Sequence, residues 1–177
     1  MKTALIIVDF QNDFVCGSLG FPGAETLDGR LVQRIEQTLS AGGDLVFTYD
    51  THGEDYLKTV EGQNLPIPHC IRGTEGWKLY GRTAAYLTDA KKVFEKQTFG
   101  CLELGEYLRQ EGYDLVELAG LVSNICVLSN AIIAKAALPE SEIRVDARLT
   151  ASHDARLHTE ALDLLENLHI MVSGREE

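Results

Sequence analysis

The chain has 177 residues, of which 45% are hydrophobic, and this length is enough for one domain with a sizeable core. We therefore expect a single domain over residues 1–177. Its 27 acidic and 16 basic residues give a formal net charge of −11. This charge argues against nucleic-acid and membrane-surface partners, because both are anionic and would repel it.

Two further features concern the compartment. No apolar stretch reaches the roughly 18 residues that span a bilayer, and the N-terminus has no small-residue cleavage site, so we expect a cytoplasmic location. The spacing of the cysteines shows neither CxxC pairs nor the density of a secreted disulfide scaffold. We expect free thiols at all four positions: Cys16, Cys70, Cys101 and Cys126.

The first predicted unit is strand, loop and helix. Thr3–Val8 is a continuous apolar run rich in branched residues, which is typical of a strand buried on both faces, and it ends at Asp9. An amphipathic helix follows the loop, since apolar residues recur at every fourth position: Leu27, Leu31, Ile35 and Leu39. The second strand, Asp44–Tyr49, ends just before Asp50 and His52.

Residues 53–76 have little periodicity and predict a long excursion over the surface. The segment contains Pro66, Pro68 and His69. Loops of this length in a compact domain are usually functional. A short helix is expected after it, over Trp77–Leu87.

Strands and helices alternate through the rest of the chain. The predicted strands are Val93–Glu95, Leu115–Ala119, Glu142–Asp146 and His169–Val172. The predicted helices are Leu102–Gln110, a helix that follows Cys126 and ends before Pro139, and Thr159–Leu168. Such alternation implies right-handed crossovers and an α/β fold, a mostly parallel sheet with helices on both faces.

The stretch Asp114–Lys135 organises the chemistry. It reads as a strand, a tight turn at Gly120 and a helix whose first turn carries Cys126. The helix N-terminus would stabilise a thiolate and lower the pKa of Cys126 below the free value of about 8.5. The alternative is a small hydrophobe packed beneath the helix.

Polar residues end four successive predicted strands. Asp9, Asp50 with His52, Lys96 and the turn before Cys126 occupy these ends. Ligands of open α/β sheets bind beyond the carboxyl ends of the strands. Taken singly, these residues are a turn former, a surface lysine and a core thiol; together they supply a base, a cation and a nucleophile at one edge.

Three motifs resemble the signatures of isochorismatase-like cysteine hydrolases: VDFQNDF near the N-terminus, EKQTFG around Lys96 and GLVSNICV around Cys126. The resemblance implies a six-stranded parallel sheet flanked by helices, and a homo-oligomer. It also implies a catalytic triad of Asp9, Lys96 and Cys126, a cis peptide between Leu121 and Val122, and an oxyanion hole made by the backbone N–H groups of Val122 and Cys126.

The chemistry requires these residue types. Asp9 takes the proton of Cys126, the thiolate attacks an amide carbonyl, and Asp9 returns the proton to the leaving amine. Lys96 would lower the pKa of both neighbours. In this family, hydrolysis of the isochorismate vinyl ether proceeds without a cysteine at this position, so Cys126 favours a small-molecule amide as substrate.

A second group of residues suggests a metal. Asp50 and His52 are two residues apart on an extended segment and project the same way, and His69 from the following loop would complete one face of an ion. The pattern resembles the metal site of nicotinamidases, which implies a divalent ion, commonly zinc, and nicotinamide as substrate. Glu61 lies in the intervening loop and is a candidate fourth ligand, although we favour its interpretation as a solvated glutamate.

Four apolar residues are candidates for the substrate wall: Phe14, Trp77, Phe99 and Leu121. No tryptophan directly precedes the PIPHC sequence, although many nicotinamidases have one there, so Tyr56 or Trp77 would have to substitute. His153, His158 and His169 are expected away from the site, and Cys16, Cys70 and Cys101 are interpreted as structural.

Two alternatives to a nicotinamidase remain. One is a metal-independent amidase of the same superfamily that acts on a carbamoyl or ureido amide. The other is a non-catalytic member that binds a ligand or a metal.

Overall fold

The computed structural model describes residues 1–175 and contains one six-stranded parallel sheet. The strand order is β3-β2-β1-β4-β5-β6. The strands are β1 (Thr3–Val8), β2 (Asp44–Asp50), β3 (Lys92–Lys96), β4 (Leu115–Leu121), β5 (Glu142–Ala151) and β6 (Met171–Ser173). The helices are α1 (Asn12–Val15), α2 (Leu27–Ser40), α3 (Val60–Asn64), α4 (Leu102–Glu111), α5 (Leu128–Ala137) and α6 (Ala155–Asn167). The predicted six-stranded parallel α/β fold is confirmed.

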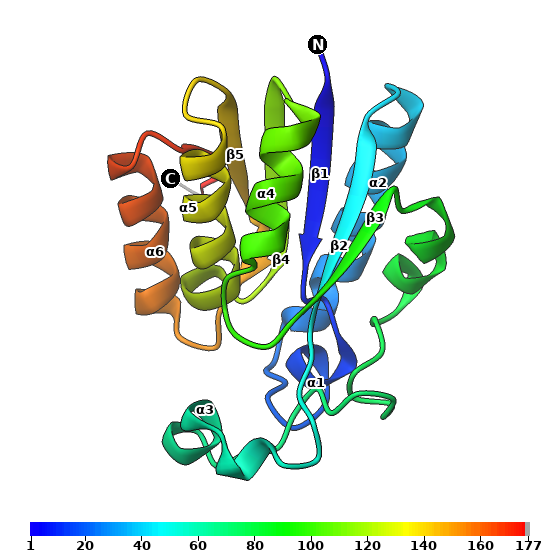
Figure 1. Ribbon diagram of the computed structural model, residues 1–177, viewed down its shortest axis with the longest axis vertical. Coiled ribbons are helices and arrows are strands. Elements are labelled where there is room, and N and C mark those ends of the chain that lie inside the picture. The colour runs from blue at the N-terminus through cyan, green and yellow to red at the C-terminus, as the bar shows by residue number, and fades with distance from the viewer. Residues whose placement is uncertain (176–177) are drawn as a thin grey trace.

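Helices cover both faces of the sheet, with α4, α5 and α6 on one face and α2 on the other (Figure 1). Side chains of β1 show why, because successive residues point to opposite faces. Ala4, Ile6 and Val8 belong to the core beneath α4, α5 and α6, whereas Leu5 and Ile7 belong to the core beneath α2. A strand buried on both faces needs the continuous apolar run seen in the sequence.

The carboxyl ends of the strands meet at one edge of the sheet, at the bottom of Figure 1. The excursion between β2 and β3 runs below this edge and carries α3, and α1 lies at the same end. The fold therefore gathers the strand-end residues and the long excursion at one place.

Several boundaries differ from the predictions. β5 runs five residues beyond Asp146 to Ala151, because its register shifts at a bulge opposite Leu118 and Gly120 and the strand then continues. α6 begins at Ala155, four residues earlier than predicted, because the Asp154 side chain accepts hydrogen bonds from the first-turn amides.

The loop after β1 and the excursion between β2 and β3 contain short helices that the sequence pattern did not indicate. α1 and α3 are only four and five residues long, too short for a periodic signal. The helix expected over Trp77–Leu87 is instead a 3₁₀ helix, Arg82–Asp89. Among residues 1–175, no helix combines the length and apolarity needed to cross a bilayer.

Candidate active site

Asp9, Lys96 and Cys126, called the triad below, come from three separate elements and meet at the carboxyl edge of the sheet. Asp9 follows β1 in a left-handed conformation with φ 46°, Lys96 ends β3, and Cys126 lies in a π-helical turn between β4 and α5. The Lys96 Nζ lies 2.5 Å from Asp9 Oδ2 and 3.5 Å from Cys126 Sγ. The spatial convergence predicted from the strand ends is confirmed.

All three triad side chains are buried, with at most 5% of each residue exposed. Burial disfavours the Lys96 ammonium, but attraction by Asp9 and Cys126 outweighs it and raises the pKa of Lys96. Burial raises the pKa of Asp9, and Lys96 opposes that shift. The Thr48 hydroxyl donates a hydrogen bond of 2.6 Å to Asp9 Oδ1 and orients the carboxyl group.

The thiol of Cys126 differs from the prediction. Burial is the largest influence and raises the pKa of Cys126, Lys96 lowers it, and the carboxylates of Asp9 and Asp50 raise it further. The net shift is upward, so the expected low thiol pKa is wrong for the resting state. With its pKa raised, Cys126 rests as a thiol, and a nucleophile forms only when its proton is taken.

The turn before Cys126 has the backbone that the resemblance implied. The peptide between Leu121 and Val122 is cis. At Gly120, φ is +109°, and a Cβ atom there would lie 2.1 Å from the carbonyl oxygen of Val8. Only glycine allows β4 to lie this close to β1 next to Asp9.

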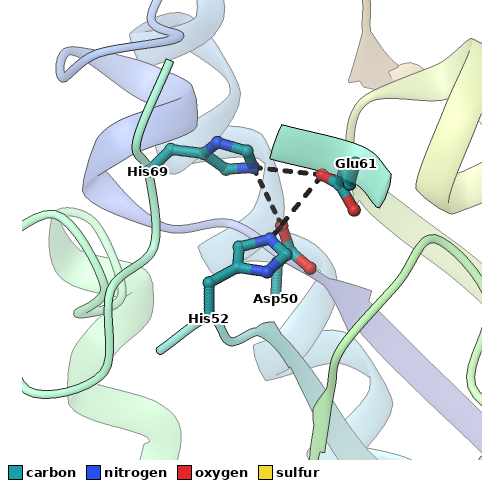
Figure 2. A group of neighbouring side chains, drawn as sticks. All are labelled: Asp50, His52, Glu61 and His69. Carbon is teal, nitrogen blue, oxygen red and sulfur yellow. Dashed lines mark hydrogen bonds and ion pairs between the residues drawn. The ribbon is translucent and has the colours of Figure 1, made fainter. Parts of the chain in front are cut away.

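The predicted metal residues lie together next to Lys96, whose Nζ is 3.3 Å from Asp50 Oδ1, and Glu61 joins them (Figure 2). Asp50, His52, Glu61 and His69, called the donor cluster below, place one ligand atom each within 4.8 Å of the others. The Glu61 side chain is only 15% exposed, with Oε1 3.6 Å from His52 Nε2 and 3.5 Å from His69 Nε2. The interpretation of Glu61 as a solvated residue is wrong, because α3 turns it back over the strand end.

Four contacts within the donor cluster, 3.1–3.6 Å long, are close to the spacing of ligands around one zinc ion. Ligands at about 2.0–2.2 Å from zinc would be about 3.3–3.6 Å from one another. The Nε2 atoms of His52 and His69 lie 3.1 and 3.3 Å from Asp50 Oδ2. The other ring nitrogen of His69, Nδ1, hydrogen-bonds the carbonyl oxygen of Ile67 at 2.8 Å, which orients the ring in the way typical of metal-bound histidines.

A pocket of about 510 Å³ is lined both by Cys126 of the triad and by residues of the donor cluster. Cys126, Asp50, Glu61 and His69 contribute its polar lining. Its apolar walls include Phe14, Leu19, Leu65, Ile67, Phe99, Val122 and Ile125. The pocket can therefore receive a flat apolar molecule with one polar group directed at the sulfur and another at the donor cluster.

The predictions for the substrate wall are only partly met. Phe14 and Phe99 line the pocket. Trp77 does not: its Nε1 donates a hydrogen bond of 2.9 Å to Thr51 Oγ1, and its ring packs on Tyr49. Leu121 is fully buried in the core beneath α2 and also does not line the pocket. Tyr56 packs edge-to-face against the His52 and His69 rings and does not line the pocket.

His153 was expected away from the site, and this expectation is wrong. It lines the pocket from the turn after β5, because the unpredicted extension of that strand brings the turn to the carboxyl edge. Its ring lies 6.4 Å from that of Phe21. His158 hydrogen-bonds Ser123 in the nucleophile turn. The four cysteines are free, as predicted.

Comparison with known proteins identifies the family. Residues 3–177 match the isochorismatase domain. The chain belongs to the isochorismatase family. It is 33% identical to the nicotinamidase/pyrazinamidase of Mycobacterium tuberculosis (strain ATCC 25618 / H37Rv) over 147 residues, 72% of this chain and 76% of the relative.

Solved structures of the isochorismatase family agree in fold. The crystal structure of nicotinamidase PncA from Bacillus subtilis matches with a TM-score of 0.84 and 32% identity, covering 98% of this chain and 99% of the other. The pyrazinamidase of Pyrococcus horikoshii in complex with zinc matches with a TM-score of 0.85 over 99% and 100% of the two chains; at 23% identity it shows the fold alone. The relatives support a hydrolase that acts on amides.

Proposed function

We propose that this protein is a metal-assisted cysteine amidase that hydrolyses nicotinamide to nicotinate and ammonia. One observation carries the proposal: a single apolar pocket is lined both by Cys126 of the triad and by three residues of the donor cluster, Asp50, Glu61 and His69. The pairing suits an aromatic amide, with its carboxamide at Cys126 and its ring nitrogen towards the donor cluster. The relatives named nicotinamidase support the same substrate.

In the first half of the proposed reaction, Asp9 accepts the proton of Cys126 and the sulfur attacks the amide carbonyl carbon. The backbone N–H groups of Val122 and Cys126 would stabilise the resulting oxyanion. Asp9 then gives its proton to the amide nitrogen, the C–N bond breaks, and ammonia leaves a thioester on Cys126.

In the second half, Asp9 takes a proton from water, and the oxygen attacks the thioester carbon. The C–S bond breaks, the proton returns to sulfur and the acid is released. Throughout, the Lys96 ammonium keeps the Asp9 carboxylate in place and compensates the negative charge that develops in the buried site.

The donor cluster would hold a divalent ion, and zinc suits its two imidazoles and two carboxylates. When bound, such an ion is a Lewis acid that can accept a ring nitrogen or water as a ligand. Asp50, 3.3 Å from Lys96 Nζ, links the donor cluster to the triad. Phe14 and Phe99 would orient the ring between them.

The test measures ammonia release from nicotinamide by the purified protein, before and after chelation. We expect hydrolysis that is lost in Cys126→Ala and after chelation, and that is retained in Cys16→Ala, which removes an exposed thiol outside the pocket. Hydrolysis of only carbamoyl or ureido amides, unaffected by the chelator, would replace this proposal with a metal-independent amidase. A Cys126 thiol inert to alkylation and no amide hydrolysis would indicate a non-catalytic member.

The proposal extends to the whole chain. We infer that residues 1–177 form one domain, which the match over residues 3–177 supports, and that the protein is a cytoplasmic homo-oligomer; the four free thiols support the location. Sedimentation of the purified protein tests the oligomeric state.

A further inference from the structure

Two fully buried side-chain carboxamides, Gln11 and Asn130, bond to the backbone on either side of the pocket. Each residue has 0% exposure. A carboxamide has one acceptor oxygen and an NH₂ group with two donor hydrogens. In both residues the oxygen accepts one hydrogen bond and the nitrogen donates two.

Gln11 extends the sheet beyond the end of β1. The ladder of hydrogen bonds between β1 and β2 ends at Val8 and Thr48. The next peptide groups of β2 that point toward β1 are those of Asp50, and they have no partner in β1. Gln11 supplies one: its Oε1 accepts from Asp50 N at 2.8 Å, and its Nε2 donates to Asp50 O at 2.9 Å and to Trp77 O at 2.8 Å. The side chain thus replaces a peptide group and determines where Asp50 lies.

Asn130 performs the equivalent task on the nucleophile side. Its Nδ2 donates to the carbonyl oxygens of Cys126, at 2.8 Å, and Phe99, at 3.0 Å, and its Oδ1 accepts from Cys101 N at 2.9 Å. This joins the Cys126 turn to the loop that follows Lys96. The same loop accepts a hydrogen bond of 3.0 Å from Lys96 Nζ at the Thr98 carbonyl. Asn130 therefore sets the distance between the Lys96 ammonium and the sulfur.

We infer that Gln11 and Asn130 are separate positioning residues, Gln11 for the metal-donor strand end and Asn130 for the nucleophile. The inference rests on the proposed function, because it assigns each residue to one half of that site. Neither side chain contacts the pocket. Each acts through backbone groups that only a carboxamide can satisfy, since a carboxylate would place an oxygen against two carbonyl oxygens.

The experiment makes the isosteric variants Gln11→Glu and Asn130→Asp, with the exposed substitutions Gln37→Glu and Asn167→Asp as controls for the added charge. Gln11→Met and Asn130→Leu remove the carboxamide without adding charge. Zinc affinity is measured by competition with a chromophoric chelator. The iodoacetamide rate of Cys126 is measured by peptide mass spectrometry on metal-free protein whose folding is checked by circular dichroism.

We expect the Gln11 variants to bind zinc about 10–100-fold more weakly, the usual effect of losing a group that orients a ligand. Their Cys126 alkylation rate should stay within about twofold of the parent. The Asn130 variants should show the reverse. Zinc affinity stays within about twofold, and alkylation slows about tenfold, since Cys126 lines an open pocket and its rate follows the thiolate fraction that Lys96 supports.

Equal losses of both properties in both sets of variants would overturn the inference and show that the two residues only stabilise the fold. A parent protein that binds no zinc would overturn both the metal centre and the role of Gln11. Gln11 variants that bind zinc as tightly as the parent protein would overturn the role of Gln11 alone.

Discussion

The triad and the donor cluster both contribute residues to one pocket, but the chain builds them differently. The triad comes from the ends of β1 and β3 and the turn after β4, so the hydrogen bonds of the sheet determine its geometry. The donor cluster takes Asp50 and His52 from the end of β2, and takes Glu61 and His69 from the long excursion. The ladder hydrogen bonds of the sheet, with the buried side chains of Gln11 and Asn130, hold the residues at its edge, whereas Glu61 and His69 depend on how the excursion folds.

The difference suggests how each half responds to substitution. The triad is buried and its charges compensate one another, so a change there should affect chemistry and folding together. The donor cluster concentrates two carboxylates and two imidazoles, so a change there should act through the bound ion.

The largest effect is expected at the nucleophile. Cys126→Ala removes the only atom able to form the thioester and should lower kcat by at least about 10³-fold. Ammonia release measures it, with Cys16→Ala as the control that keeps its rate. A variant that keeps more than a tenth of the parent activity would show that Cys126 does not form the thioester.

The next effect is on folding. Lys96→Met leaves the Asp9 carboxyl buried without its cation and should lower the free energy of unfolding by about 3–5 kcal/mol, besides abolishing activity. Urea unfolding measures it. Lys92→Met, at the exposed start of the same strand, should cost under about 1 kcal/mol. Equal costs for the two lysines would contradict the idea that the sheet edge depends on this ion pair.

A smaller effect is expected in the excursion. Glu61→Gln replaces one carboxylate of the donor cluster and should weaken zinc binding about 10–100-fold. As a consequence, saturating zinc should raise the midpoint of thermal unfolding less in this variant than in the parent. Chelator competition and calorimetry measure the two quantities. The control is Glu75→Gln, which changes an exposed glutamate of the same excursion. Equal zinc affinities of the two variants would exclude Glu61 as a ligand.

The smallest effect concerns the segment that returns from the excursion to the sheet. Asp28 on α2 accepts hydrogen bonds from Thr83 and Arg82 in the 3₁₀ helix. Burial raises the pKa of Asp28, but these hydrogen bonds outweigh it and lower the pKa overall. A depressed pKa in the folded state means that the stabilisation is present above the unfolded value of about 3.9 and is lost as the pH falls through the folded value.

Asp28→Asn should therefore lower the free energy of unfolding by about 1 kcal/mol at pH 7. The difference from the parent should shrink as the pH falls below about 4. Urea unfolding across this pH range measures it, with the exposed Asp89→Asn as control. A difference that is constant with pH would show that the effect is steric rather than ionic.

Much of the fold could be predicted because its signals are local. The run Thr3–Val8 matches β1 residue for residue, and the four-residue spacing from Leu27 to Leu39 identified α2. The end of β5 could not be predicted, since it depends on pairing across a bulge with β4, far away in the sequence. Because the end of β5 was predicted too early, His153 was expected far from the site, although it lines the pocket.

The site was predictable to the same extent. Asp9, Lys96 and Cys126 each follow a recognisable strand, and the parallel order of strands brings such ends together. Glu61, the pocket wall and the thiol pKa were not predictable from the chain alone. The position of Glu61 depends on how α3 folds back. The pocket wall depends on the direction of the Trp77 ring, and the thiol pKa depends on burial and on how many carboxylates surround the sulfur.

By itself, the sequence determined the elements, their parallel order and the chemical types at the carboxyl edge, because apolar periodicity and strand ends are properties of neighbouring residues. Only the tertiary structure decided that Glu61 faces two imidazoles, that Trp77 and Leu121 lie outside the pocket, and that Cys126 is a neutral thiol at rest. Orientation and pKa depend on burial and on charges that arrive from distant parts of the chain, and no local pattern records them.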